Sequence, residues 1–521
     1  MNKFEEIKAA KDGLDVWPDI ERFAREGWET ITEDDKVRMK WYGVFFRRHI
    51  PGFFMLRIRI PGGIASGEQM RAIASVAADY ARGEVDLTTR QQVQIRWFQI
   101  ENVPEMLARL LAVGIDTRQT GMDNIRNVVG CSLAGITTHE LFDASPVVRA
   151  FNARFVGNKE FSNLPRKFNV TITACVDNCL HLETQDIALG PAVKHIGDEL
   201  VAGFNIQVGG KQGSGGFRPA DSLDVFVRPE EAAEVAAQIV LLFRDHGSRE
   251  TRSRARLAFL IEEWGPVRFR DELEARIGRP LERAGRDARG GHHTDHLGFA
   301  PQKEPSLYSV GLSVPIGRLT SAQLMAAADL ADTYGRGELR LTPEQSLILP
   351  HVTDTNLPRL LSEPLLEELR PDSLPAVRGT VSCTGLGTCD MALAETKETS
   401  LAVARRIDRA VRLDRPISIH WSGCPASCAN HLVADIGVQG DKARVNGEVI
   451  EVYTIFAGGR TGVSARSGAP VLTRVPGYQI GDVIERLAQA HAGGRDLVEA
   501  GHAIAREVRA ADEQPALIPV G

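Results

Sequence analysis

The sequence predicts an internally duplicated α+β (α/β) protein, and two repeats carry this prediction. The triplet Arg-Gly-Glu at 82–84 recurs at 336–338, and the residues on either side keep the same offset without a gap. Further along, the segment 164–179 aligns with 413–428, including a pair of cysteines in each. A duplication of this kind constrains the architecture before any single motif is considered.

Both copies contain the same series of elements. Each begins with an alternating apolar strand, continues with a helix-period stretch and then has a second strand, which predicts strands at 53–63 and 307–317, helices at 67–81 and 321–335, and strands at 87–95 and 341–349. A charged helix is expected over 253–282, followed by a linker at 285–305. We interpret His292, His293 and His296 of this linker as solvated loop residues, a metal site being the alternative.

Composition excludes several classes of protein. Of 521 residues, 43% are hydrophobic and 25% are charged, which is typical of globular domains. The net charge of −6 gives no general reason to bind nucleic acid, and no apolar run is long enough for a membrane helix. The N-terminal stretch has acidic residues and no apolar core, so a cytoplasmic protein is expected.

Four cysteines of the second half have the spacing of a metal centre, Cys383-x5-Cys389 and Cys424-x3-Cys428. Four thiolates hold an iron–sulfur cluster or a structural zinc, and the x5 and x3 spacings favour the cluster. Cys424-Pro425 is expected to enter a helix, which would place Cys428 one turn further on the same face.

The first half is one thiolate short of this set. It has Cys131, Cys175 and Cys179, but Thr137 stands where Cys389 would. We interpret the three cysteines as buried small apolar residues, with a second cluster or a zinc ion as the alternatives.

Basic residues show the opposite asymmetry between the halves. Arg57, Arg59 and Arg90 align with a glycine, a serine and a glutamate of the second half. Strand alternation places Arg57 and Arg59 on one face. The full set is suited to neutralising a polyanionic ligand, and it comprises Arg57, Arg59, Arg90, Arg126, Arg166 and Lys167.

Six motifs together carry a family resemblance. They are SCTGLGTC at 382–389, SGCPASCANH at 422–431, NIRN at 124–127, LPRKFN at 164–169, MLRIRIPGG at 55–63 and LTTRQ at 87–91. The chain closely resembles, over nearly its whole length, the assimilatory nitrite and sulfite reductases that carry sirohaem coupled to a [4Fe–4S] cluster.

The resemblance implies a pseudo-twofold architecture, in which ferredoxin-like half-domains accompany two larger sirohaem-reductase α/β domains. The expected boundaries are 1–118 for the N-terminal segment with the first half-domain, 119–300 for the first sirohaem-binding domain and linker, 301–371 for the second half-domain, and 372–521 for the domain with the cluster cysteines.

The resemblance also assigns roles to individual residues. Cys383, Cys389, Cys424 and Cys428 match the cluster ligands, and Cys428 matches the one whose sulfur also ligates the sirohaem iron. Arg57, Arg126 and Lys167 match the substrate-site cations. Positions around the sirohaem are matched by Arg59, Thr88, Arg90 and Gln94, and we expect Arg166 there as well.

The expected activity is the six-electron reduction of nitrite to ammonia by a monomer. No GxGxxG fingerprint follows a strand, so electrons should come from a separate small carrier, which the resemblance implies is reduced ferredoxin or flavodoxin. Sulfite reductases resemble one another in having a second lysine where this chain has Asn169, which favours the less charged nitrite. The alternatives are a sulfite reductase, a related sirohaem enzyme acting on tetrapyrrole precursors, and a cluster-bearing electron relay without catalytic activity.

Overall fold

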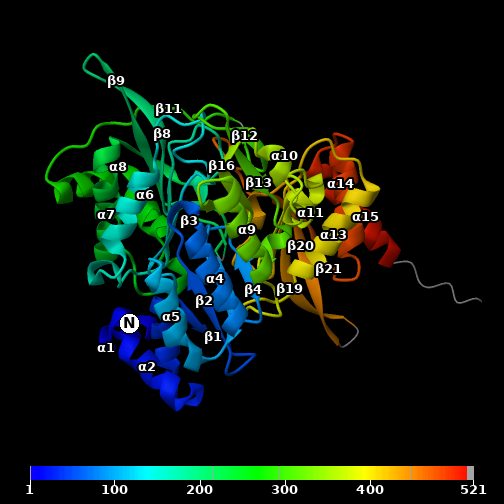
Figure 1. Cartoon of the computed structure of the whole chain (residues 1–521), viewed down its shortest axis with the longest axis horizontal. Helices are drawn as coiled ribbons and strands as arrows, with labels where there is room; N and C mark the ends of the chain where they lie inside the picture. Colours follow the sequence, from blue (N-terminus) through cyan, green and yellow to red (C-terminus); the bar gives the residue numbers. More distant parts are fainter. Residues whose placement is uncertain (1, 214, 292, 446–447, 513–521) are drawn as a thin grey trace, which may run out of the picture. The chain divides into compact units, whose positions relative to one another are not determined.

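The computed structural model describes residues 2–213, 215–291, 293–445 and 448–512 (Figure 1). His292 of the linker therefore lies outside the described residues. The chain divides into two compact units, residues 1–372 and residues 373–521. Within the described ranges, no helix has the length and apolar character needed to span a membrane.

The first unit contains three sheets. In strand order, the first has β1 (Val44–Phe46), β2 (Phe54–Ile58), β5 (Val93–Phe98), β4 (Glu84–Leu87) and β14 (Arg318–Thr320). The second has β12 (Gly298–Pro301), β13 (Leu307–Leu312), β16 (Leu347–Thr353), β15 (Glu338–Leu341) and β3 (Ile64–Ser66). The third has β10 (Asp221–Val227), β9 (Glu199–Val208), β8 (Ile187–Ile196), β7 (Phe168–Ile172) and β6 (Ile125–Val129), with β11 (Arg286–Asp287) beside β8.

Helices cover these sheets and bury their apolar faces. The first unit has α1 (Lys3–Ala10), α2 (Trp17–Glu26), α3 (Glu33–Arg38), α4 (Gly67–Tyr80), α5 (Val103–Ala112), α6 (Ser145–Phe155), α7 (Pro229–His246), α8 (Leu257–Ile277), α9 (Ser321–Tyr334), α10 (Leu357–Leu360) and α11 (Leu365–Glu368). One apolar core lies beneath the first two sheets, and another lies between the third sheet and α6, α7 and α8.

The second unit contains one sheet, β17 (Thr380–Ser382), β18 (Ile419–Ser422), β19 (Ile436–Val445), β20 (Glu448–Ala457) and β21 (Ala469–Pro476), with helices α12 (Pro375–Arg378), α13 (Lys397–Ala410), α14 (Ile480–Ala492) and α15 (Leu497–Asp512). Its first three strands are parallel and the last two antiparallel. The third sheet of the first unit has the same pattern, because β6, β7 and β8 are parallel and β9 and β10 antiparallel.

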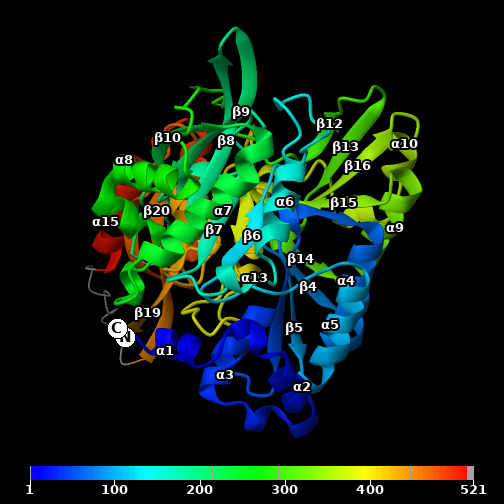
Figure 2. The same cartoon turned by 90° about the vertical axis from the view of Figure 1, so that its left-hand side faces the viewer.

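The two half-repeats of the first unit exchange strands. Strand β14 of the second repeat pairs with β4 of the first, and β3 of the first pairs with β15 of the second. Helices α4 and α9 lie side by side (Figure 1, Figure 2). Each begins with a capping box, Ser66 with Gln69 and Thr320 with Gln323, which satisfies amide groups of the first turn. The predicted duplication and α+β class are therefore confirmed.

The continuous strand predicted at 87–95 is wrong in its first part. Residues 88–92 form a turn between β4 and β5, in which the Thr88 hydroxyl accepts hydrogen bonds from the amides of Arg90 and Gln92. Gln91 has φ 53°, which a strand does not allow. The predicted strand at 341–349 is interrupted in the same way, since β15 ends at Leu341, β16 begins at Leu347 and Gln345 has φ 61°.

Replacing Asp86 by asparagine should destabilise the strand exchange. Asp86 is buried on β4, where it pairs with Arg96 of β5 and with Arg318 of β14 at 2.9 Å. Removing its charge leaves the buried Arg96 guanidinium uncompensated and should cost about 3 kcal/mol of unfolding free energy, measured by urea unfolding. Asp79→Asn is the control, because its pair with Arg109 is exposed. Equal losses in both variants would contradict the assignment.

Candidate active site

Arg57 and Gln94 are cross-strand neighbours in the first sheet. The antiparallel register of β2 and β5 places them directly opposite one another, so their side chains lie on the same face. Arg57 is half-buried and its Nη1 donates to the Thr120 carbonyl at 3.0 Å. The Gln94 side-chain oxygen accepts a hydrogen bond from Arg96. The Thr120 contact connects this face to the segment that leads into β6.

Arg59 and Arg126 are held by backbone carbonyls of that segment. Arg59 is 2% exposed, and its guanidinium donates to the carbonyls of Arg118, Gln119, Ile125 and Arg126 at 2.9–3.2 Å. Arg126 donates to Thr120 O at 3.1 Å and Met122 O at 3.0 Å. Among the described residues, neither arginine forms an ion pair, and the Nε of each is buried without an acceptor. Both cations are therefore positioned by backbone carbonyls and not by paired carboxylates.

The positive charges converge on Arg126. Burial lowers the pKa of Arg126 well below its usual range, and nearby Arg57, Arg90 and Arg166 lower it further. Burial likewise lowers the pKa of Arg59 to about 10, and that of Arg166 to about 10 with a further contribution from Arg252. Asp123 lies 3.9 Å from Arg166 and raises the pKa of Arg126, so it offsets part of the repulsion. Because like charges repel, an additional anion would stabilise the cluster further.

Asn127 positions the turn that carries Arg90. Its side-chain amide donates to the carbonyls of Ile60 and Arg90 at 2.7 and 2.9 Å, and it is fully buried. Sequence analysis did not single out this residue, although it lies within the NIRN motif. The contact explains how Thr88, whose hydroxyl closes the turn, and Arg90 are held close to β6.

Arg166, Lys167 and Asn169 lie at the start of β7 and just before it. Arg166 and Lys167 are half-buried, and Asn169 is 7% exposed. The Asn169 backbone N–H donates to Asp186 Oδ2 at 2.7 Å, and Asp186 in turn pairs with Arg256 at 2.7 Å. Within the described part of the chain, the Asn169 side-chain oxygen has no hydrogen-bond partner. This buried polar group remains open to an additional ligand.

The four cysteines of the second unit come from two neighbouring loops. Cys383 directly follows β17 and Cys424 lies two residues after β18. Because these strands are parallel and paired up to Ser382 and Trp421, both loops leave the same edge of the sheet. The Cys383 sulfur accepts a hydrogen bond from the Gly423 amide at 3.2 Å, which joins the loops.

The expected helix at Cys424-Pro425 is wrong. Residues 423–430 form consecutive turns, with Ser427 at φ 55° and Asn430 at φ 59°. Left-handed residues interrupt a helical hydrogen-bond ladder, so Cys428 is placed by a loop and not by a helical turn. Cys428 is exposed, whereas Cys383, Cys389 and Cys424 are half-buried.

These four sulfurs are electrostatically coupled without being crowded together. Burial raises the pKa of Cys383 to about 11 and that of Cys424 to about 12, and the neighbouring cysteines raise both. A tighter group of possible metal ligands lies elsewhere among the described residues. The sulfurs of Cys131, Cys175 and Cys179 all lie within 4.8 Å of one another. Among the described residues, no three of the second unit's cysteine sulfurs meet this limit, and the wider spacing is compatible with a multi-iron cluster.

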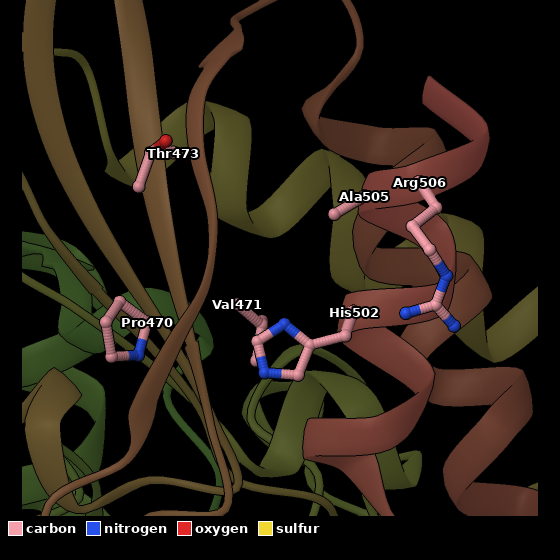
Figure 3. A pocket seen from close by; sticks show the side chains of 6 residues that line it. All are labelled: Pro470, Val471, Thr473, His502, Ala505 and Arg506. Carbon is pink, nitrogen blue, oxygen red and sulfur yellow. The ribbon is translucent and has the colours of Figure 1, made fainter. Parts of the chain in front are cut away.

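A shallow pocket of the second unit lies apart from these cysteine loops. It opens between β21 and α15 (Figure 3), and its lining comprises Pro470, Val471, Thr473, His502, Ala505 and Arg506. It contains no cysteine and no paired acid and base, so we assign it no catalytic role.

Comparison with known proteins identifies the family. The nitrite and sulphite reductase 4Fe-4S domain matches residues 121–281 and 373–499, and the nitrite/sulfite reductase ferredoxin-like half domain matches residues 47–113 and 300–366. The chain belongs to the nitrite and sulfite reductase family. Both models match twice, as the internal duplication requires.

Relatives of this family align along most of the chain. Ferredoxin–nitrite reductase of Synechococcus elongatus is 44% identical over 94% of this chain and 96% of its own length. An assimilatory ferredoxin-dependent nitrite reductase of Haloferax mediterranei is 39% identical over 95% of this chain and 89% of its own length. The solved structure of the NirA protein of Mycobacterium tuberculosis is 30% identical, has a TM-score of 0.89, and covers 96% of this chain and 95% of its own.

The cofactors of this family are sirohaem and a [4Fe–4S] cluster, and the residues present fit both. Sirohaem carries many carboxylates, which match Arg59 and Arg126, two cations without an ion pair in the part of the chain that the structure describes. The cluster requires four thiolates, and the two loops of the second unit carry four free cysteines. The expected cofactors are therefore consistent with the donor chemistry of the site.

Proposed function

We propose that this chain catalyses the assimilatory reduction of nitrite to ammonia, with electrons from reduced ferredoxin or flavodoxin. The observation that carries the proposal is the cluster of positive charge around the half-buried Arg126, which shares the Thr120 carbonyl with Arg57 and forms no ion pair among the described residues. A site with this excess of fixed positive charge is suited to an anionic cofactor and a small anionic substrate. The balanced reaction is NO2− + 6 e− + 8 H+ → NH4+ + 2 H2O.

Each residue of the site has a proposed task. Cys383, Cys389, Cys424 and Cys428 hold the cluster, and Cys428 also ligates the sirohaem iron. When bound, the two cofactors would supply single-electron transfer to the substrate. We assign the binding of sirohaem carboxylates to Arg59, Thr88, Arg90, Gln94 and Arg166.

Arg57, Arg126 and Lys167 bind nitrite in this proposal. Their N–H groups donate charge-assisted hydrogen bonds to the two nitrite oxygens and hold the anion while protons are added. Arg57 and Arg126 are both anchored on the Thr120 carbonyl, at 3.0 and 3.1 Å, so their positions are coupled. The Lys167 ammonium is the more mobile donor, since its charge lies at the end of a flexible chain.

Asn169 is the proposed discriminator between nitrite and sulfite. Its buried side-chain oxygen has no hydrogen-bond partner among the described residues. An amide here adds no charge, which suits a monoanion, whereas an ammonium would favour a partly dianionic sulfite.

Asn169→Lys is therefore expected to raise the ratio of kcat/KM for sulfite over nitrite. The increase should be roughly tenfold, because pocket shape and proton delivery also discriminate. Wild type and variant are compared at equal sirohaem and iron content, with the same artificial donor. An unchanged or reduced ratio would show that Asn169 is not the discriminator.

The proposal also covers the assembly, location and division of the chain and the docking of its electron carrier. The protein acts as a monomer in the cytoplasm, where a reducing environment keeps its seven cysteines free of disulfides. We also propose that the chain has four parts, with boundaries after residues 118, 300 and 371. An acidic carrier such as ferredoxin or flavodoxin docks on a locally basic surface.

Kinetics on one purified sample test the proposed function. Reduced viologen is offered with nitrite and with sulfite, and kcat/KM is measured for each at known cofactor content. A clear preference for nitrite supports the proposal. Preference for sulfite would assign the chain to the other branch of the family, and no turnover of either anion by protein with full cofactor content would favour an electron relay.

A further inference from the structure

The first unit contains a second sulfur group, separate from the cluster cysteines. Cys131 follows β6, and Cys175 and Cys179 follow β7, so the parallel pairing of these strands brings their loops to one edge of the third sheet. Their three sulfurs all lie within 4.8 Å of one another. Each cysteine is only 1% exposed, and no disulfide joins them. The prediction that these residues are buried is therefore confirmed.

His296 of the linker contacts this group. Its Nε2 lies 3.4 Å from the Cys131 sulfur, across 165 residues of sequence. The interpretation of His296 as a solvated loop residue is therefore wrong, since its side chain is half-buried. The interpretation as a loop residue exposed to solvent holds for His293. Its side chain is exposed, and its Nδ1 contacts the Asn178 carbonyl at 2.6 Å.

The backbone at His296 is fixed by its surroundings. Its amide donates to the Thr294 hydroxyl at 3.1 Å, and it adopts φ 59°. Its carbonyl lies so close to Gly311 that a Cβ at position 311 would be 2.2 Å away. Gly311 is the counterpart of Arg57 in the duplication, so the loss of that arginine makes room for the linker. The linker can therefore pass close to β13 and bring His296 to the Cys131 sulfur.

The distances match a single tetrahedral ion. Bonds of about 2.3 Å from zinc to sulfur and about 2.0 Å to nitrogen place two sulfurs about 3.8 Å apart, and a sulfur and a nitrogen about 3.5 Å apart. The observed contact of 3.4 Å and the limit of 4.8 Å agree with these values. A four-iron cluster would place eight atoms between its ligands, for which three sulfurs this close leave no room.

The surroundings of the three sulfurs also favour a cation. The shell around the sulfurs is apolar and includes Leu133 and Leu180. A thiolate in such a shell is costly unless a positive charge accompanies it.

We propose that Cys131, Cys175, Cys179 and His296 bind one structural Zn²⁺ in a tetrahedral Cys3His site. The set of atoms within 4.8 Å comprises the three sulfurs alone, so the imidazole completes the tetrahedron by a small movement toward Cys175 and Cys179. Binding releases the protons of the thiols. Zinc has no redox chemistry, so the ion fastens the linker to the third sheet without exchanging electrons with the cofactors.

Metal analysis of the full-length holoprotein tests this site. Zinc and iron per chain are measured by plasma mass spectrometry after growth with added zinc chloride, for wild type, Cys175→Ala, His296→Ala and the matched control His293→Ala. We expect about one zinc per chain in wild type and in His293→Ala, and less than about a tenth of that in Cys175→Ala, with iron unchanged. His296→Ala should weaken zinc retention during dialysis against a chelator roughly tenfold or more.

X-ray absorption at the zinc edge keeps the test decisive if Cys175→Ala fails to fold. Three sulfurs at about 2.3 Å and one nitrogen at about 2.0 Å in wild type support the site, and loss of the nitrogen in His296→Ala assigns it. Wild type without zinc, zinc surrounded mainly by oxygen, or zinc retained fully in Cys175→Ala would overturn the proposal. A nitrogen signal that persists in His296→Ala would exclude His296 as a ligand and overturn the Cys3His assignment.

Discussion

Cys383→Ser is expected to remove the cluster iron and to reduce nitrite turnover to background. A serine hydroxyl at this position cannot replace the thiolate, and Cys383 also joins the two ligand loops through the Gly423 amide. With the cluster lost, single electrons have no route to the site. Iron and acid-labile sulfide per chain, together with viologen-driven turnover, measure the effect.

Cys179→Ala is the matched control for the cluster. It removes the counterpart of Cys428 in the other half and should leave the iron count and turnover unchanged while zinc is lost. The two variants therefore affect different metals. Full iron and activity in Cys383→Ser, or loss of four irons in Cys179→Ala, would mean that the ligands were assigned to the wrong half.

Lys167→Ala should lower kcat/KM for nitrite about tenfold to a hundredfold, because a desolvated charge-assisted hydrogen bond contributes roughly 1.5–3 kcal/mol. Lys167→Arg retains the positive charge and should lose less. Lys159→Ala is the control, since Lys159 is exposed and paired with Asp15. Sirohaem content is measured in each variant, so that loss of cofactor is not mistaken for loss of binding.

Unchanged nitrite kinetics in Lys167→Ala with full sirohaem content would contradict the assignment of Lys167 as an anion-binding residue. An equal loss in Lys159→Ala would show that the effect is a general one of surface charge. Restoration of kcat/KM by Lys167→Arg would instead show that the charge at this position matters more than its shape.

The duplication made most of the fold predictable. Repeats such as 82–84 and 336–338 fixed which strands and helices correspond, and the structure adds that β3 and β14 are exchanged between repeats. The turns at 88–92 and 423–430 were not predictable from periodicity. Their left-handed residues, Gln91 and Ser427, depend on local hydrogen bonds and loop connections that apolar spacing does not encode.

The sequence predicted which residue types form the site, but it did not predict their contacts. The asymmetry of arginines between the halves indicated an anion site, but only the structure shows that Arg59 and Arg126 are anchored by carbonyls. The approach of His296 to Cys131 could not be inferred, since the two are separated by 165 residues. The signal for this approach was the alignment of Gly311 with Arg57 in the duplication, because a missing side chain makes room for another segment.

Electron and nitrogen balance tests the central claim most directly. Purified protein with full cofactor content is given reduced ferredoxin and limiting nitrite, and oxidised ferredoxin, residual nitrite and ammonia are counted. We expect six electrons and one ammonia for each nitrite, with no gaseous nitrogen oxide released. One or two electrons per nitrite with nitric or nitrous oxide as the product, or no nitrite consumption while sulfite is reduced, would contradict the account.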